Sequence, residues 1–175
     1  MLYIVEASPE NIHIVQKIAY ETWPATFDKI LSSEQITYML EMMYSTTSLL
    51  QQMTKLAHHF LLAMENNEYL GFISYELAYK ETSQTKIHKI YILPQAQGRG
   101  VGKKLIKAVE DLAISKGDKS LLLNVNKYNE AEKFYARLGF NTIGTENIDI
   151  GSGFLMEDKI MCKKLTQDNP LQNVN

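Results

Sequence analysis

The chain has 175 residues, of which 45% are hydrophobic and 22% charged, an ordinary composition for one globular domain with a complete core. The net charge is −2 and there is no basic tail, so we expect no nucleic-acid partner. Apolar runs fall short of the ~20 residues of a membrane span, and Met1–Val5 lacks the charged start of a signal peptide. We therefore expect a cytoplasmic protein with no membrane partner.

Cysteine and histidine give no sign of a disulfide or a metal centre. Cys162 is the only cysteine, which excludes an internal disulfide. The four histidines lack ligand spacing, and the adjacent His58 and His59 point to opposite faces if they lie on a strand. The sequence therefore predicts no metal site.

The first third of the chain predicts one short strand and then three helices. The strand covers Leu2–Glu6, and the first helix follows it until Trp23-Pro24 breaks the helical pattern. A second helix is capped by Ser33 and runs to about Met43. A third helical run extends from Leu49 to Leu56.

The remainder predicts strands that alternate with two further helices. A turn at Glu65-Asn66-Asn67 joins the first pair of strands into a hairpin. The last ten residues, 166–175, form a polar tail that we expect to fray. The predicted strands, apart from one described below, are His59–Met64, Tyr69–Tyr79, Thr85–Leu93, Phe140–Ile143 and Phe154–Leu165.

A glycine turn between a strand and a helix carries the first functional signal. The apolar run Ile90–Pro94 is followed by Gln97–Gly102, in which three of the last five residues are glycine, and an amphipathic helix follows and ends at Gly117. Glycines leave backbone N–H groups uncovered, and a helix start adds unpaired N–H groups and the positive end of its dipole. Such a turn binds the phosphates of a ligand.

The spacing of the glycines decides between phosphate-binding loops. Gly98 stands only three residues before Gly102-Lys103, and Lys104 replaces the Ser or Thr that a nucleoside-triphosphate loop requires. Neither glycine frame completes the G-x-G-x-x-G pattern of a dinucleotide fold. The pattern that fits is Q/R-x-x-G-x-G/A, read from Gln97 to Gly102. It resembles the pyrophosphate loop of the GCN5-related N-acetyltransferases, which bind acetyl-CoA.

A second motif lies downstream in the order that this family has. The short strand Leu121–Asn126 is followed by Asn129–Phe140, which is similar to the family pattern N-x-A-x-x-F-Y-x-x-x-G-F. The resemblance covers roughly Ile73 to Leu165, and the first seventy residues match only in outline. It implies an α+β fold, a single domain (1–175) with a mixed sheet of about six to seven strands and helices on both faces. Residues 1–70 would then form the acceptor side and residues 71–165 the acetyl-CoA core.

The resemblance also implies which residues hold the co-substrate acetyl-CoA. Two parallel strands of the family separate, so that the pantetheine amides pair with an exposed strand edge. By position, Tyr135 is the general acid that protonates the departing sulfur, because a phenol is protonated at neutral pH. The other implied cofactor-binding residues are Tyr91, Ile92, Leu93, Gln97, Gly98, Arg99, Gly100, Val101, Gly102, Lys103, Asn124 and Asn129.

The general base is less clear, because this chain departs from the family there. Many relatives carry a glutamate on the fourth strand, and Lys86 stands at that position. His88 lies two residues along the same strand face and titrates near neutrality, so we predict it as the substitute. Lys86 would lower the pKa of His88 by repulsion between like charges. Glu76, Tyr91 and a chain of water molecules are the alternatives.

The acceptor substrate depends on the weakly matched N-terminal half. The segment from Glu21 to Phe27, together with Ile150–Asp158, is similar to the bacterial subgroup that acetylates spermidine and spermine. We predict Glu21, Trp23 and Phe27 as substrate-binding residues. Carboxylates on the surface that could attract a polycation are Glu21, Glu34, Glu41 and Glu157.

Two classes of function follow from these motifs. The first is an N-acetyltransferase that moves an acetyl group from acetyl-CoA to a primary amine by direct attack, with a polyamine or another small amine as acceptor. Acetylation of a protein amine is a variant of it. The second is a non-catalytic sensor of acyl-CoA, which the missing glutamate at position 86 favours and Tyr135 opposes. A homodimer is compatible with either class.

Overall fold

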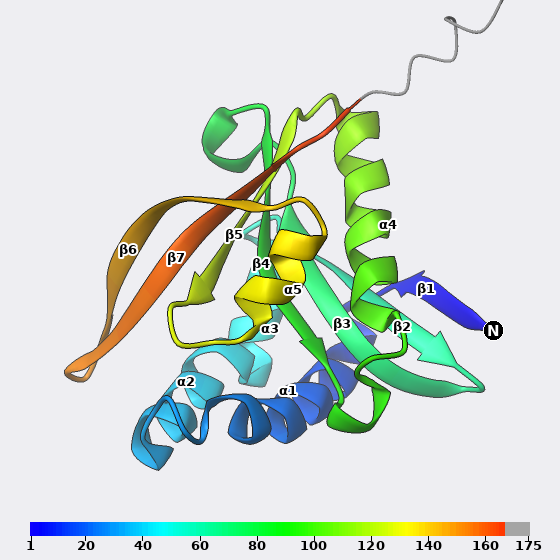
Figure 1. Cartoon of the computed structure of the whole chain (residues 1–175). Helices are drawn as coiled ribbons and strands as arrows, with labels where there is room; N and C mark the ends of the chain where they lie inside the picture. The colour runs from blue at the N-terminus through cyan, green and yellow to red at the C-terminus, as the bar shows by residue number, and fades with distance from the viewer. Residues whose placement is uncertain (167–175) are drawn as a thin grey trace, which may run out of the picture.

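The computed structural model describes residues 1–166, which form one α+β domain around a single mixed sheet (Figure 1). Seven strands of the described chain make up the sheet, in the order β1-β2-β3-β4-β5-β7-β6. Their bounds are β1 Leu2–Glu6, β2 His59–Glu65, β3 Glu68–Glu76, β4 Gln84–Ile92, β5 Ser120–Asn126, β6 Asn141–Gly151 and β7 Phe154–Lys164. The helices are α1 Ile12–Phe27, α2 Ser33–Tyr44, α3 Thr46–Thr54, α4 Val101–Lys116 and α5 Ala131–Arg137, with short 3₁₀ turns η1 Pro9–Asn11, η2 Tyr79–Glu81 and η3 Pro94–Ala96.

Strands β4 and β5 form the one parallel pair among these strands, and all other neighbours are antiparallel. A parallel pair needs a crossover connection, which the helix α4 provides here. The left-handed Gly117, with φ of 93°, ends α4 and turns the chain into β5.

The helices cover both faces of the sheet, as the sequence predicts (Figure 1). The apolar stripe of α4, which includes Val101, Leu105 and Val109, is buried against β1–β5. On the other face α1 packs against β3 and β4, and α2 and α3 pack against α1. Aromatic rings fill the second interface, where Trp23 of α1 lies 5.7 Å from Tyr91 of β4.

Strand β3 ends at Glu76, before the predicted Tyr79, which begins the turn η2. Four further predicted boundaries need correction. The helix α1 continues through Pro24 to Phe27, because the carbonyl oxygen of Pro24 still accepts a hydrogen bond from the N–H of Asp28 at 3.0 Å. Ser32, not Ser33, caps α2: its hydroxyl oxygen accepts from the N–H of Gln35 at 3.1 Å. In the same way Ser45 caps α3, which therefore begins at Thr46.

The fourth correction concerns β6, which spans Asn141–Gly151 and is much longer than the predicted Phe140–Ile143. Its polar, exposed sequence hides its strand character, and pairing along the length of β7 stabilises it. Of the predicted fraying tail, residues 167–175 lie outside the described residues. Between residues 1 and 166, no helix is long and apolar enough to cross a membrane.

Candidate active site

The glycine turn adopts the conformation that a phosphate cradle requires. Gly98 and Gly100 have φ of 74° and 79°, in the left-handed region that favours glycine. Helix α4 starts immediately afterwards at Val101, so its first N–H groups have no partner within the helix. A Cβ atom at Gly98 or Gly100 would meet no atom within 4 Å, so the space in front of the loop is open. The side-chain amide of Gln97 donates to the carbonyl oxygen of Ile92 at 3.2 Å and ties the loop to the end of β4.

Strands β4 and β5 separate beside this loop, as the family resemblance implies. They pair over only four positions, from Gln84 opposite Ser120 to Ile87 opposite Leu123. Beyond Ile87, β4 keeps its partners in β3, and β5 keeps its partners in β7. Beyond Ile87 the facing backbone of the two strands therefore has no strand partner, and both strands line the opening.

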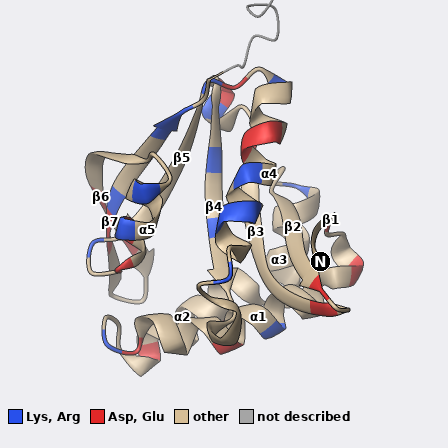
Figure 2. Ribbon diagram, turned by 45° about the vertical axis from the view of Figure 1, so that its right-hand side comes forward, with Lys and Arg blue, Asp and Glu red and all other residues tan. Residues whose placement is uncertain are grey.

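A cavity of about 1440 Å³ occupies the opening and extends from the glycine loop to the helices α1 and α2. This volume exceeds the ~300–1,000 Å³ of an ordinary ligand pocket, so it offers room for two substrates. Figure 2 shows basic residues on β4 and on the first turns of α4, and Lys86, Lys89 and Lys103 line the cavity. Lys103, beside the glycine loop, places a positive charge at the cofactor end, which suits an anionic ligand.

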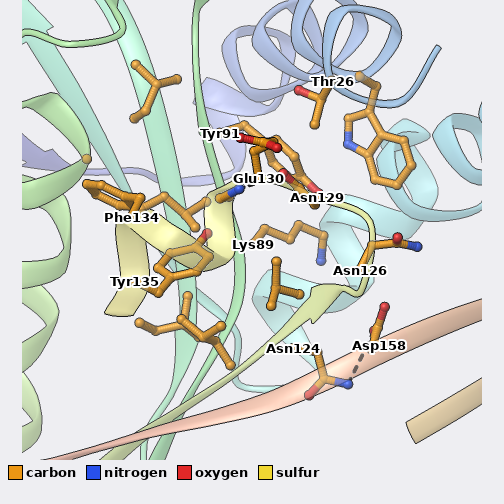
Figure 3. A pocket seen from close by; sticks show the side chains of 18 of the residues that line it. Thr26, Lys89, Tyr91, Asn124, Asn126, Asn129, Glu130, Phe134, Tyr135 and Asp158 are labelled. Carbon is orange, nitrogen blue, oxygen red and sulfur yellow. Dashed lines mark hydrogen bonds between the residues drawn. The ribbon is translucent and has the colours of Figure 1, made fainter. Parts of the chain in front are cut away.

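Tyr135 projects from α5 into the cavity, and its hydroxyl group points toward the interior (Figure 3). The ring is buried between Phe134 and Phe140, with ring centroids 5.4 Å and 5.9 Å away. Burial raises the pKa of Tyr135 above its ordinary value, so the hydroxyl keeps its proton throughout the neutral range. Phe134 in turn packs on the cradle, where a Cβ atom at Gly102 would lie 3.1 Å from its ring.

The opposite end of the cavity is formed by the contact between α2 and the β6–β7 hairpin. The hydroxyl of Tyr38 donates to the carbonyl oxygen of Ile150 at 2.8 Å, and the side-chain amide of Gln35 donates to that of Leu155 at 3.2 Å. The Tyr38 and Phe154 rings pack at 5.3 Å. These contacts close the wall that consists of Trp23, Met39, Met43, Ile148, Ile150 and Met156.

A hydrogen-bonded network of charged groups lies between the two ends. Asn124 of β5 donates from its amide nitrogen to Glu146 at 2.9 Å and to Asp158 at 3.3 Å, and it accepts from Lys86. Figure 3 shows Asn124 and Asp158 across the cavity from Tyr135. The other oxygen of Asp158, Oδ1, is buried without a hydrogen-bond partner. Burial, opposed by the bond from Asn124, raises the pKa of Asp158.

The sequence prediction names Asp158 only as part of a longer segment, and it misses Glu146. A signal for Asp158 exists, because Met156 and Asp158 occupy alternate positions of β7 and are both buried. Burying a carboxylate at an inward position of a strand costs folding free energy unless it has a partner, so such a residue often has a function. No comparable signal marks Glu146, which lies on a polar strand whose extent depends on tertiary pairing.

His88 lies in the cavity wall but in an environment that differs from the one predicted. Its Nε2 atom lies 2.9 Å from a carboxylate oxygen of Glu76, and its ring stacks on His58 at 3.9 Å. Burial, with Lys89 and Lys86 nearby, lowers the pKa of His88 to about 3. The lowering by Lys86 agrees in direction with the prediction, but so weak a base is poorly matched to an ammonium group. The role of His88 as general base stays a prediction.

Most of the predicted site residues line the cavity. Those that do are Trp23, His88, Tyr91, Ile92, Gln97, Gly98, Gly100, Val101, Gly102, Lys103, Asn124, Asn129 and Tyr135. Four predicted residues lie outside its lining. Leu93 is buried, Arg99 pairs with Glu65, Glu21 is exposed, and Phe27 is buried in the core against Trp23. The binding roles of all these residues stay predictions.

Comparison with known proteins is decisive for the family. The sequence model of the acetyltransferase (GNAT) domain matches residues 27–156, which is most of the chain and both ends of the cavity. The chain belongs to this GNAT family. It is thus an acetyl-CoA-dependent N-acetyltransferase, with acetyl-CoA as co-substrate.

Individual relatives agree with this assignment. A spermidine N(1)-acetyltransferase of Thermoplasma acidophilum is 27% identical over 161 residues, which cover 89% of this chain and 96% of that protein. The crystal structure of PaiA N-acetyltransferase from the same organism, in complex with coenzyme A, superimposes with a TM-score of 0.78 at 26% identity, covering 94% of this chain and 99% of that one. A GCN5-related N-acetyltransferase from Rhodopseudomonas palustris has the same fold, with a TM-score of 0.80 at 21% identity and coverage of 93% and 95%.

Proposed function

We propose that this GNAT enzyme acetylates a primary amine of a small cationic molecule, such as a polyamine, with Tyr135 as general acid. The observation that carries the proposal is the placement of a buried, protonated phenol and a buried carboxylate in one cavity. Tyr135 and Asp158 both line the opening between β4 and β5. Burial raises the pKa of Tyr91, and the nearby Tyr44, Tyr135 and Asp158 raise it further. Tyr135 and Asp158 therefore both lie close to Tyr91.

Asp158 can act on the acceptor in two ways: its carboxylate attracts the ammonium group, and it can then accept the ammonium proton. A carboxylate in a cavity attracts an ammonium group, and the free Oδ1 atom lacks the partner that an ammonium N–H would supply. Because burial raises the pKa of Asp158, this carboxylate takes up a proton more readily than an exposed one. We assign to Asp158 the removal of the proton that the ammonium must lose before its nitrogen can attack.

The proposed transfer balances as follows. The neutral amine nitrogen attacks the thioester carbonyl carbon, the C–N bond forms, and the C–S bond breaks. The sulfur leaves as a thiolate and receives the proton of Tyr135. The attacking nitrogen loses its extra proton to solvent as the amide forms, Asp158 releases the proton that it took from the ammonium to solvent, and a proton from solvent restores Tyr135. Burial keeps Tyr135 protonated, so its proton is available when the thiolate forms.

We propose a cationic acceptor because two carboxylates line the cavity near the acceptor end. Glu146 and Asp158 share Asn124 and face the cavity together. Apolar residues such as Met39, Met43 and Ile148 line the adjoining wall and suit the methylene segments of an alkyl amine. The spermidine N(1)-acetyltransferase among the relatives supports the same substrate class.

A panel of amines tests the proposal through release of the coenzyme A thiol. We expect spermidine, spermine and a simple diamine to release thiol from acetyl-CoA with kcat/KM at least about tenfold above that of a neutral-tailed alkylamine or a peptide α-amine. Preference for the peptide would favour acetylation of a protein amine. If the enzyme binds acetyl-CoA but releases thiol with none of these amines, the proposed substrate class is wrong and the sensor hypothesis gains support.

A further inference from the structure

A lysine side chain lies where the proposed function places the acceptor ammonium. Lys86 of β4 lines the cavity, and its ammonium group donates to Oδ1 of Asn124. The amide nitrogen of the same Asn124 donates to Glu146 at 2.9 Å and to Asp158 at 3.3 Å. Burial lowers the pKa of Lys86, and the negative charges of Glu146 and Asp158 oppose this shift. The acceptor end therefore already holds a primary amine of the protein itself, beside the carboxylates that would bind an ammonium group.

The register of the sheet places Lys86 at the narrow end of the opening between β4 and β5. Lys86 lies opposite Leu122, and the last pair before the strands separate is Ile87 opposite Leu123. Asn124 is the next residue of β5, so the hydrogen bond between Lys86 and Asn124 crosses this narrow end. Alternation along the strands puts Leu122 and Asn124 on the same face of the sheet as Lys86. The Lys86 amine is therefore held over the point where the two strands part.

The narrow end of the opening is also where we expect the acetyl group of a bound donor. The glycine loop follows the other end of β4, beyond Ile92. An acetyl-CoA molecule with its phosphates in that loop would extend its arm along the free edge of β4 toward Ile87. At a rise of ~3.3 Å per residue this stretch spans about 16 Å, a length that suits an extended arm with two amide groups. The thioester and the Lys86 amine would then meet at the same end of the opening.

Three features of the surroundings suit Lys86 for attack on a thioester. Burial lowers the pKa of Lys86, so a larger fraction of its amine is neutral than in an exposed lysine. The Oδ1 atom of Asp158, which has no hydrogen-bond partner, can accept the proton that the ammonium loses. The amine also belongs to the chain, so it meets the thioester without the entropic cost of binding a separate molecule.

We propose that the protein acetylates its own Lys86, with acetyl-CoA as donor. The ammonium of Lys86 first gives a proton to Asp158. The neutral Nζ atom then attacks the thioester carbonyl carbon, the C–N bond forms, and the C–S bond breaks. Coenzyme A leaves as a thiolate and receives the proton of Tyr135, while Nζ loses its extra proton to solvent. Exchange with solvent restores Asp158 and Tyr135. The step rests on the proposed function for these two residues, but it needs no acceptor molecule.

Acetylation of Lys86 would change the charge of the acceptor end. The ammonium of Lys86 now lies beside two carboxylates, those of Glu146 and Asp158, with Asn124 linking all three groups. Acetylation turns the ammonium into a neutral amide and leaves both carboxylates in place. The modified acceptor end would therefore attract a cationic acceptor more strongly than the unmodified one.

Mass spectrometry of the full chain tests the proposal in the absence of any amine acceptor. The protein is incubated with acetyl-CoA that carries a deuterated acetyl group, and the acetyl occupancy of each lysine is followed, with labelled and unlabelled acetyl counted together. We expect Lys86 to be acetylated at least about tenfold faster than the exposed Lys55, at a rate independent of protein concentration. Excess coenzyme A should occupy the donor site and suppress acetylation of Lys86 but not of Lys55. Lys86→Arg should abolish the suppressible acetylation.

Lys89 is the matched control within the same strand, because it also lines the cavity and burial lowers its pKa to about 8. Its amino group donates to Gln52 of α3 at 2.7 Å and lies 5.9 Å from the Tyr44 ring of α2, so its contacts are with helices and not with Asn124. We therefore expect Lys89 to be acetylated no faster than Lys55, and Lys89→Arg to leave the acetylation of Lys86 unchanged.

The measurement on the parent protein decides the question even if a variant fails to fold. Acetyl occupancy of Lys86 no higher than that of Lys55, or equal acetylation of Lys89, would overturn the proposal. The proposed function is tested separately by thiol release with added amines. A protein that acetylates spermidine but not Lys86 would refute self-acetylation alone, whereas one that acetylates Lys86 but no added amine would refute the proposed acceptor class alone.

Discussion

The cofactor end of the cavity is built mainly from backbone, whereas the acceptor end is built from side chains of separate elements. At the first end, the glycine loop and the start of α4 follow each other within ten residues and expose N–H groups. At the second end, α1, α2, β6 and β7 each contribute side chains to the wall. A backbone site needs glycines at fixed spacing and is therefore readable in a sequence, while a side-chain site exists only after folding. The same fold can therefore keep one co-substrate and change its acceptor.

The largest expected effect comes from a charge at the backbone end. Gly100→Asp and Gly102→Asp should weaken acetyl-CoA binding at least about 100-fold in calorimetry. The first places a side chain and a negative charge on a left-handed position, and the second forces a side chain toward Phe134 at 3.1 Å. Gly153→Asp is the matched control: Gly153 has φ of 77° and open space around it, but it lies in the β6–β7 turn. Binding by either cradle variant at the level of this control would contradict a backbone cradle.

The next effect concerns Tyr135, which lies between the two ends. Tyr135→Phe removes the proton donor and keeps the ring, so kcat should fall by about 10²-fold while acetyl-CoA affinity stays near that of the parent. Tyr75→Phe removes the hydroxyl of another buried tyrosine, outside the cavity, and should leave kcat within about twofold. Unchanged turnover in Tyr135→Phe, with the chemical step limiting, would leave Tyr135 a packing residue.

A third variant tests whether the acceptor end depends on one buried carboxylate or on surface charge. Asp158→Asn should lower kcat/KM for spermidine by about tenfold or more, whereas Glu157→Gln should change it little. Glu157 is the neighbouring carboxylate and pairs with Lys127 on the surface at 2.7 Å. Equal losses in the two variants would indicate a general attraction by negative charge instead of a specific contact.

Asp158 also predicts a dependence of stability on pH. Its pKa is raised in the folded protein, so the folded state resists ionisation and the carboxyl group destabilises it once pH exceeds the ordinary value of 3.8. The thermal midpoint of Asp158→Asn should therefore exceed that of the parent at pH 7, and the difference should vanish near pH 3, where the carboxyl group is protonated in both states. A difference that is constant with pH would assign the effect to packing.

The smallest effect distinguishes two cations of the glycine loop. Lys103 lines the cavity, whereas Arg99 pairs with Glu65 and is half exposed. We expect Lys103→Gln to raise the Kd for acetyl-CoA by about fivefold to tenfold and Arg99→Gln by no more than about threefold, because exposed ion pairs contribute ~0–1 kcal/mol. A larger loss in Arg99→Gln would show that Arg99 exchanges Glu65 for the ligand.

The same contrast explains how far the sequence could predict the molecule. The glycine loop follows from a local pattern, and the position of Tyr135 follows from the family resemblance between Ile73 and Leu165. The helices on both faces follow from helical patterns along the whole chain. The extent of β6 does not, because pairing with β7 overrides its polar sequence. Nor could local patterns bring His58 to His88, since their contact depends on a bulge in β4 and a left-handed Ala57. Spacing along the chain can predict contacts within one element, whereas this contact joins residues of two separate segments.

The short pairing of β4 with β5 makes the sheet two plates, β1–β4 and β5–β7–β6, which share only four residue pairs. Each plate presents amide groups to the other across the gap, and an amide that a bound ligand shields from water without pairing with it costs about 1–3 kcal/mol. A thioester arm with its own amides at strand-like spacing removes this cost, whereas a plain alkyl thioester does not. We therefore propose that the protein selects its acyl donor along the arm, far from the acetyl group, and that the bound donor pairs with both plates.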